Sequence, residues 1–299
     1  MDLRPIQPRA TDGSSIPTQL DADQPDVASA QRSSFKQAYV FSLTRPCHPH
    51  NLAKLSTYRD DADVGSIYLI RHGQASFGAH DYDVLSPIGI RQAQILGEHL
   101  ANLGVRLDRC IAGGLRRQQH TANAALAQFT ALDLPTPDLE INRAFDEFDA
   151  DAVIRALLPA MLPDEPQALH VMRNAAEHKT EFQRLFALII GRWLGGNHDT
   201  PGLQSWLAFV AQVQSGLAAL LESAEPNQHI AVFTSGGTIA ALLHLITRMP
   251  AQQAFELNWQ IVNTSLNQLK FRGREVALAS FNSHAHLQLL KMPELITYR

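Results

Sequence analysis

The chain has 299 residues, of which 45% are hydrophobic and 18% are charged, so it can build a sizeable apolar core. Its formal net charge is -4, and this mild acidity argues against a general nucleic-acid binder. The sequence has no apolar run as long as a membrane span and no signal-peptide pattern at its start. We therefore expect a cytoplasmic protein with neither a nucleic-acid nor a membrane partner.

Cysteine and histidine give no sign of a metal centre. Cys47 lies in a polar irregular stretch and Cys110 in an apolar one that we expect to be buried. Both are expected to be unpaired thiols of a reducing compartment. His284 and His286 would share one face of a strand, but no third ligand accompanies them, so we expect no bound metal.

Residues 1–63 differ in composition from the rest of the chain. They are rich in Pro, Ser, Asp and Gln, and they show no sustained hydrophobic period. Such a segment buries too little apolar surface to offset the entropy lost on ordering. We expect residues 1–63 to be a mostly disordered extension and residues 64–299 to be one α/β domain.

The ordered part is expected to begin with a strand and a helix. Residues 66–70 form a short apolar run rich in β-forming residues, which predicts a buried strand. After a polar loop over residues 74–85, Ser86 and Pro87 supply an N-cap and a first helical residue. Gly104 is expected to end this helix.

The same alternation continues and later returns. Residues 105–112 predict a second strand and residues 115–129 a second helix. Residues 229–234 predict another buried strand, residues 235–237 a tight loop and residues 238–247 a helix. Alternating strands and helices favour parallel strands joined by crossover helices.

The alternation of strands and helices is absent between these two regions of the chain and after the second one. Residues 150–200 are predicted to be helical and carry no chemical motif, so they are a candidate cap over the site. Residues 203–220 predict another long helix. The last part of the chain is expected to be β-rich, over residues 258–262, 266–271 and 276–281.

Polar clusters that could bind a phosphate follow the predicted strands, and in an open α/β sheet ligands lie at the carboxyl ends of strands. The first is Arg71-His72-Gly73. Arginine offers a planar fork that matches a phosphate, and neutral imidazole is a nucleophile near neutral pH. The second cluster lies at the start of the helix predicted over residues 115–129, where the helix dipole favours an anion. There Arg117 is the candidate phosphate ligand, although its role could be exchanged with that of Arg116.

The third cluster, residues 145–149, places three carboxyl groups beside two phenylalanines. Apolar neighbours can desolvate a carboxyl group, raise its pKa and make it a general acid. A solvated acidic loop is the alternative.

Taken in order, these segments resemble the histidine phosphatase superfamily, in the branch that includes cofactor-dependent phosphoglycerate mutases and many small phosphatases. The resemblance rests on residues 67–73, the helix start at 85–93, the segment 117–122 and the loop at Glu147. It covers about residues 65–285. It implies an α/β three-layer sandwich with a mostly parallel central sheet, helices on both faces and a helical cap insertion.

The resemblance also implies roles for individual residues. His72 is similar to the nucleophile that becomes phosphorylated, and Glu147 to the proton donor for the leaving oxygen. Arg71 and Arg117 match the guanidinium pair that clamps the phosphoryl group, and Gly73 matches the tight backbone that holds the His72 tautomer. Family members need no metal, and we expect neither a metal nor a cofactor here.

The family usually places a second histidine after the late strand, and in this chain Ser235 stands there, followed by Gly236. Serine supplies a hydroxyl donor but no charge. Loss of a transition-state donor typically costs about a hundredfold to a thousandfold in rate. We expect Ser235, Gly236 and the start of the following helix to bind the phosphate, so that phosphoryl transfer is retained but slowed.

These residues predict a phosphatase that hydrolyses a small phosphomonoester or a phosphoprotein through a phosphohistidine. A phosphoglycerate mutase-like phosphotransferase is an alternative, although we identify no residues for a substrate carboxylate. Ser235 suggests a further alternative, a non-catalytic phosphate-ligand binder. The last strands offer an edge at which a homodimer could form. Residues 74–85 and 150–200 are expected to select the substrate.

Overall fold

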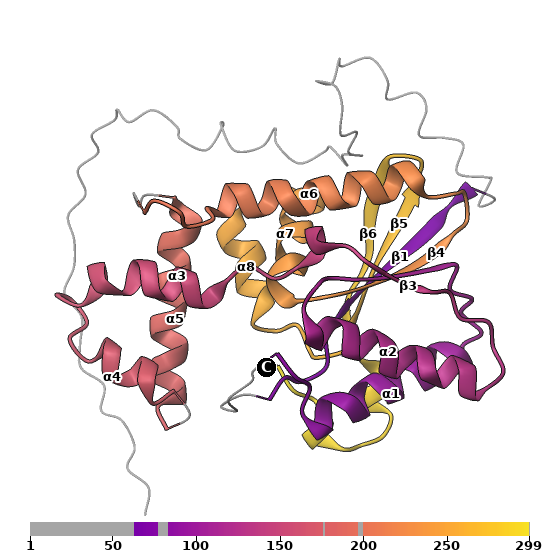
Figure 1. Ribbon diagram of the computed structural model, residues 1–299, viewed down its shortest axis with the longest axis horizontal. Coiled ribbons are helices and arrows are strands. Elements are labelled where there is room, and N and C mark those ends of the chain that lie inside the picture. Colours follow the sequence, from indigo (N-terminus) through magenta and orange to yellow (C-terminus); the bar gives the residue numbers. More distant parts are fainter. Residues whose placement is uncertain (1–62, 77–82, 176, 197–199, 299) are drawn as a thin grey trace, which may run out of the picture. The chain divides into compact units, whose positions relative to one another are not determined.

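The structure is a computed structural model that describes residues 63–76, 83–175, 177–196 and 200–298 (Figure 1). The predicted extension, residues 1–63, lies outside this part of the chain except for its last residue, and Cys47 lies outside it too. The prediction of disorder in the extension therefore stays a prediction.

A mixed sheet forms the centre of the described domain. Its strands are β1 (Gly65–Arg71), β2 (Arg109–Ala112), β3 (Leu139–Ile141), β4 (His229–Thr234), β5 (Leu266–Arg272) and β6 (Glu275–Ser283). They lie in the order β3-β2-β4-β1-β5-β6. The first four pair in parallel, whereas β5 is antiparallel to β1 and β6 is antiparallel to β5. The predicted mostly parallel sheet is confirmed.

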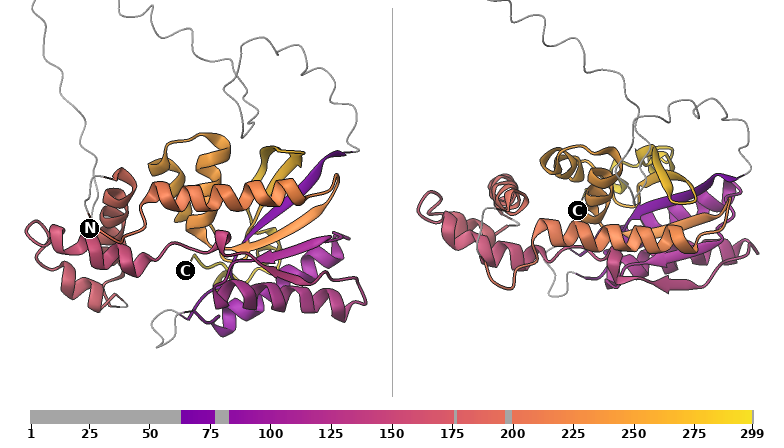
Figure 2. Two further views of the ribbon diagram at one scale, coloured as in Figure 1. Left: turned by 45° about the horizontal axis from the view of Figure 1, so that its top comes forward. Right: turned by 90° about the horizontal axis from the view of Figure 1, so that it is seen from above.

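Helices cover both faces of the sheet, as predicted (Figures 1 and 2). They are α1 (Pro87–Asn102) and α2 (Arg116–Ala131) on one face, and α6 (Trp206–Ser223) and α7 (Gly236–Thr247) on the other. Ile230 and Val232 of β4 pack with α6 and α7. The alternate residues, Ala231 and Phe233, pack with α1 and α2, because successive strand side chains point to opposite faces.

The region predicted to be helical, residues 150–200, is mostly helical where it is described, with turns between its helices. Its elements, which we call the cap helices, are α3 (Ala150–Leu157), a 3-10 turn (Leu158–Met161), α4 (Ala168–Arg173) and α5 (Lys179–Gly195). Phe148, just before α3, stacks on Trp193 of α5 with 4.6 Å between ring centroids. Trp193 meets Trp206 of α6 edge-on at 5.5 Å, so an aromatic cluster attaches the cap helices to the sheet domain.

Local signals place the predicted start of α1 correctly. The Ser86 Oγ accepts a hydrogen bond of 3.0 Å from the Gly89 N–H, and Pro87 is the first helical residue. The helix ends at Asn102, and Gly104 follows with a φ of 68°. This left-handed conformation is one that glycine adopts without steric cost.

One predicted strand is wrong. Residues 258–262 do not pair in the sheet, because α8 (Ala251–Asn258) ends there and a loop follows. The apolar residues of this segment mimic a strand, but its backbone bonds to the last turn of α8 and to side chains instead. The Ile261 carbonyl, for example, accepts a hydrogen bond from the Arg71 guanidinium. This loop is consequently part of the candidate site.

Two other placements differ from prediction. Gly236 and Gly237 are not in a loop but form the first turn of α7. His284 and His286 do not share a strand face, because β6 ends before them and α9 (Ala285–Gln288) begins. The first N–H groups of a helix have no partner inside it, so the early start of α7 leaves donors at the sheet edge.

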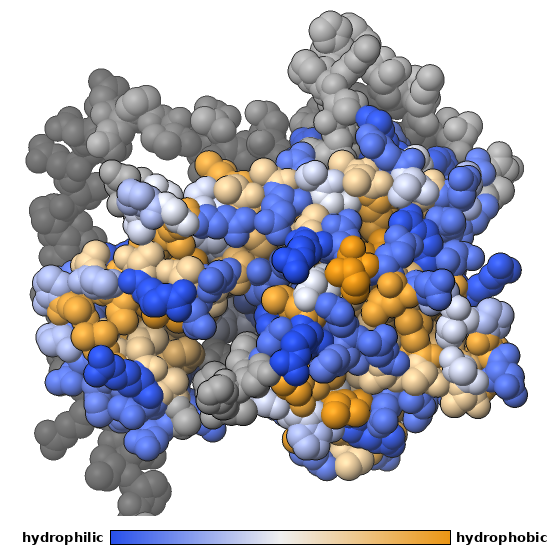
Figure 3. Space-filling view, in the orientation of Figure 1, coloured by the Kyte–Doolittle hydropathy of each residue, from blue (hydrophilic) through white to orange (hydrophobic). Residues whose placement is uncertain are grey.

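The remaining elements are short. Strand β2 begins at Arg109 rather than at residue 105, and β3 was not predicted because three residues show no period. The 3-10 turns Arg143–Phe145 and Pro293–Leu295 complete the described part. None of the helices in this part is both long and apolar enough to cross a bilayer. Figure 3 shows hydrophilic and hydrophobic residues interspersed over the face that it presents.

Candidate active site

The neighbouring parallel strands β1 and β4 end at the same edge of the sheet. Arg71, the last residue of β1, lies opposite Thr234, the last residue of β4. The His72 N–H donates to the Thr234 carbonyl at 2.8 Å. The residues that follow each strand, His72 and Ser235, are thereby brought to one place, as expected where parallel strands end together.

The partners of the His72 ring assign its tautomer. Nδ1 lies 2.7 Å from the Gly73 carbonyl oxygen, which can only accept, so Nδ1 carries the proton. The Arg117 Nε–H donates to Nε2 at 3.3 Å, so Nε2 carries the lone pair. His72 therefore presents Nε2 as its nucleophilic atom, directly beside a guanidinium.

The surroundings of His72 favour the neutral ring. His72 is 4% exposed, and burial lowers its pKa well below the usual value, with the charges of Arg117 and Arg71 adding to the effect. A ring that resists protonation keeps its lone pair at neutral pH. Burial raises the pKa of Glu147, and the charges of the same two guanidinium groups offset part of that rise, so all four side chains interact electrostatically.

The structure distinguishes the two adjacent arginines. Arg117 is 8% exposed and faces His72, whereas Arg116 is exposed. Arg117 is held by Asp83, whose Oδ1 lies 2.7 Å from Nη1. The Asp83 Oδ2 also accepts from the Arg116 backbone N–H at 2.8 Å, so this carboxylate caps the start of α2.

Asp83 was missed as a site residue. It lies in the loop predicted over residues 74–85, far from Arg117 in sequence, so no local spacing connects the two. The one feature of the sequence that could have suggested Asp83 is its carboxylate, which lies in a loop next to segments that contain arginine. Asp83 orients the guanidinium of Arg117 so that Nε remains directed at His72.

Arg71 lies on another side of the site. It is 8% exposed, and its guanidinium donates to the Ile261 carbonyl. A Cβ placed on Gly236 would lie 3.7 Å from the Arg71 Cζ, so the guanidinium adjoins the first turn of α7. A guanidinium beside the N–H groups of a helix start is a suitable site for an oxyanion.

Glu147 is positioned by the same turn. Its Oε2 accepts from the Gly237 N–H at 2.9 Å, and a Cβ on Gly237 would lie only 2.2 Å from Oε1, so this approach requires glycine. Burial raises the pKa of Glu147, against the opposing effects of the Gly237 N–H and Arg117. Glu147 can therefore retain a proton and donate it.

Ser235 is fully buried at the start of α7. Its side chain does not cap the helix, and its Oγ instead accepts from the Gln118 Nε2 at 2.9 Å. Gln118 Nε2 also lies 3.2 Å from the Phe145 carbonyl, so it connects α2, the Glu147 loop and Ser235. Gln118 could not be identified from the sequence, because only its place next to Arg117 pointed to it.

The structure thus brings Arg71, His72, Arg117 and Glu147 together, with Ser235 and the first turn of α7 beside them. Within the described ranges, no three His, Cys, Asp or Glu side chains lie close enough to hold one metal ion. The arrangement offers a neutral imidazole, two guanidinium groups, backbone donors and a carboxyl group of raised pKa. These are the parts needed to move a phosphoryl group.

Comparison with known proteins gives matches of the same kind. Over 61 residues the chain is 38% identical to the mitochondrial serine/threonine-protein phosphatase Pgam5 of Caenorhabditis elegans, covering 20% of this chain and 21% of that protein. Over 77 residues it is 36% identical to a 2,3-bisphosphoglycerate-dependent phosphoglycerate mutase of a Methylobacterium strain, covering 23% and 36%. The matches therefore span well under two thirds of either relative.

A solved structure resembles the fold over a longer stretch. The phosphoglycerate mutase from Bacillus anthracis has a TM-score of 0.51 and 17% identity, covering 78% of this chain and 99% of that one. At this identity the likeness shows the fold alone. A family model of the histidine phosphatase superfamily (branch 1) matches residues 67–175 and 169–284, which is most of the described domain. The chain belongs to this superfamily.

Proposed function

We propose that the protein is a phosphatase that hydrolyses a phosphomonoester through a phosphohistidine formed at His72. The observation that carries the proposal is the His72 ring, with Nδ1–H bonded to the Gly73 carbonyl and Nε2 facing the Arg117 guanidinium. The Arg117 guanidinium would bind a phosphate group, and the lone pair of Nε2 points toward that guanidinium. Nε2 is therefore a nucleophile placed beside the position of the phosphate.

In the first step, the His72 Nε2 attacks phosphorus and the bond to the ester oxygen breaks. Arg71, Arg117 and the N–H groups at the start of α7 stabilise the charge on the non-bridging oxygens. Glu147, whose pKa is raised by burial, gives its proton to the leaving alcohol oxygen. The products of this step are the free alcohol, phosphorylated His72 and ionised Glu147.

In the second step, Glu147 accepts a proton from water as the water oxygen attacks phosphorus. The bond between phosphorus and the His72 Nε2 breaks, and the electron pair returns to the ring. Inorganic phosphate leaves, and Glu147 is protonated again for the next cycle. The Nδ1–H bond to the Gly73 carbonyl keeps the ring in one tautomer throughout.

Ser235 modifies this scheme because it stands where the family usually has a second histidine. Its hydroxyl already accepts from Gln118, and among the residues described we find no acceptor for its own proton. That proton is thus available to a phosphate oxygen. A hydroxyl adds no charge, so we expect slower turnover than a second imidazolium would give.

Two alternatives remain as outcomes of the same experiment. A phosphoglycerate mutase-like phosphotransferase is favoured by the 36% identity to such an enzyme over 77 residues. A non-catalytic phosphate-ligand binder is favoured by Ser235. We rank the phosphatase above the binder because His72 and Glu147 both have environments suited to chemistry, which binding alone does not require. We rank it above the mutase because we identify no residues for a substrate carboxylate. The substrate would be a small phosphate ester or a phosphoprotein, and the cytoplasmic location stays a prediction from sequence.

The test is alkaline rapid-quench labelling with a phosphorylated substrate, followed by mass spectrometry of His72 and measurement of released phosphate. A phosphatase gives a transient label on His72 and continuous phosphate release. A mutase gives a lasting label and transfer to a second substrate in place of release. A binder gives no label, and its phosphate release is unchanged in His72→Ala.

A further inference from the structure

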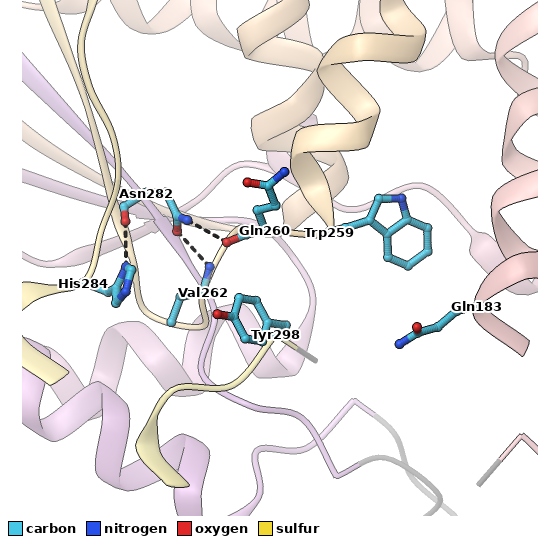
Figure 4. Close-up of a pocket in the computed structure, with 7 residues that line it drawn as sticks. All are labelled: Gln183, Trp259, Gln260, Val262, Asn282, His284 and Tyr298. Atoms are coloured by element: carbon cyan, nitrogen blue, oxygen red, sulfur yellow. Dashed lines mark hydrogen bonds between the residues drawn. The ribbon is translucent and has the colours of Figure 1, made fainter. Parts of the chain in front are cut away.

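A cavity of about 530 Å³ lies next to the candidate site (Figure 4). It lies between the end of α8, helix α5 of the cap helices and the C-terminal segment. Figure 4 shows the Trp259 indole, the Tyr298 ring and the Gln183 amide arranged around its open space. The cavity is lined by Gln183, Trp259, Gln260, Val262, Asn282, His284 and Tyr298.

One wall of the cavity is the loop that also holds the phosphate-binding residues. Gln260 and Val262 line the cavity, and the carbonyl of Ile261 between them accepts from Arg71. The next residue of the loop, Asn263, donates from Nδ2 to the His72 carbonyl at 2.9 Å. One short loop thus borders the cavity and also bonds to Arg71 and His72. A phosphoryl group at His72 and a group bound in the cavity would lie on either side of it.

The lining combines flat rings with hydrogen-bonding groups. The Trp259 ring makes an edge-on contact with Phe186 of α5, with 5.6 Å between the ring centroids. His284 directs Nδ1 at the Asn282 carbonyl, 2.8 Å away, which leaves Nε2 as an acceptor. Within the described residues, the side-chain amides of Gln183 and Gln260 make no hydrogen bond.

The lining is also uncharged. Among the described residues that line it there is no Lys, Arg, Asp or Glu, so none of them would neutralise a carboxylate or a second phosphate. An aromatic ring surrounded by amides instead suits a flat, neutral group that has an apolar face and polar substituents. The chemistry of this cavity therefore differs from that of the phosphate site beside it.

Resting on the proposed function, we propose that this cavity binds the alcohol part of the phosphomonoester, and that this part is an uncharged ring bearing hydrogen-bonding groups. A pyranose and a heteroaromatic nucleoside both have that chemistry. The two candidates differ because the pyranose ring is saturated and the nucleoside base is aromatic. The proposal disfavours phosphoglycerate, whose carboxylate would meet no cation among the described lining residues.

The kinetic arm compares kcat/KM for glucose 6-phosphate, a ribonucleoside 5′-monophosphate, glycerol 3-phosphate and 3-phosphoglycerate. We expect at least one ring substrate to exceed both ring-free substrates by about tenfold, mainly through a lower KM. Trp259→Ala and Gln183→Ala should each reduce that preference to about twofold or less. Gln214→Ala is the matched control, since this glutamine lies on α6 and lines a separate cavity.

The binding arm needs no turnover. Glucose and the free nucleoside are titrated against wild-type protein and His72→Ala by saturation-transfer difference NMR. Signal from one ring in both proteins, weakened about tenfold in Gln183→Ala but not in Gln214→Ala, supports the cavity even if every phosphate ester proves inert. Melting temperatures confirm that the variants are folded.

The outcomes separate the two proposals. Signal from glucose assigns a sugar, and signal from the nucleoside assigns an aromatic base. Binding without hydrolysis of any ester would overturn the proposed function and retain a ring-binding cavity. Hydrolysis without ring preference, together with no ring binding, would overturn the cavity assignment alone. A preference for 3-phosphoglycerate would also overturn it.

Discussion

The ends of strands β1 and β4 lie side by side, yet they contribute to the site in opposite ways. The β1 end carries the charged guanidinium groups: Arg71 directly precedes the neutral His72, and Arg117 approaches them from α2. The β4 end carries no charged side chain, and it supplies the Ser235 hydroxyl and backbone N–H groups of α7.

The difference shows what guanidinium donors and backbone N–H donors each require from the structure around them. The guanidinium groups of the β1 end are buried, and each has a carbonyl or carboxylate partner that fixes its direction. The backbone donors of the β4 end need only close approach, which the absence of a Cβ at Gly237 permits. Charge is thus concentrated on one strand end and backbone dipoles on the other.

The largest expected effect comes from removing the nucleophile of the β1 end. His72→Ala should reduce kcat on the order of 10⁴-fold or more, because no other group replaces Nε2. Phosphate release from a generic phosphomonoester measures this, and mass spectrometry should find no phosphohistidine. Turnover within tenfold of wild type would place the nucleophile elsewhere.

The next effect separates two adjacent arginines. Arg117→Ala should lower kcat/KM about a hundredfold to a thousandfold, since it removes a buried donor to the transition state. Arg116→Ala is the matched control and should stay within about twofold, because its side chain is exposed. Equal losses in the two variants would contradict the assignment of Arg117 to the site.

Glu147 connects the two strand ends, and its proton can be followed by pH. Glu147 must be protonated in the first step, so activity should fall as pH rises through its raised pKa. His72 must be neutral, so activity should fall as pH drops through its lowered pKa. Glu147→Gln should lower kcat by about a hundredfold and remove the alkaline limb. An unchanged alkaline limb in this variant would assign that limb to another group.

Asp83 tests how far the β1 end depends on positioning. Asp83→Asn retains the shape of the side chain but removes the charge that holds Arg117. We expect a loss of about tenfold in kcat/KM, because Arg117 remains but is less well directed. Asp83→Glu should recover part of the activity. A loss in Asp83→Asn as large as that of Arg117→Ala would instead indicate a direct role for Asp83.

The smallest effect should come from adding charge to the β4 end. Ser235→His should raise kcat about threefold to tenfold, less than the hundredfold or more typical of a single donor, because the backbone groups of α7 already act there. Ser235 is fully buried, so a melting temperature must show that the larger ring is accommodated. A folded variant with unchanged or lower activity would show that serine does not weaken the site.

The sequence alone determined the features that depend on neighbouring residues. The buried run of β1, the Ser86 cap of α1 and the segments that carry His72, Arg117 and Glu147 all follow from local periodicity, capping and motif order. The outlines of the α/β fold follow as well, because alternating strands and helices leave few ways to bury their apolar faces.

Only the tertiary structure decided which distant groups meet. It directed Arg117 rather than Arg116 at His72, placed Asp83 and Gln118 as their partners, and turned residues 258–262 from a predicted strand into a loop. Such contacts join segments far apart in the chain, and no short-range period encodes them. Packing of the sheet edge against α2, α7 and α8 fixes these contacts, because buried polar groups must find partners wherever the fold places them.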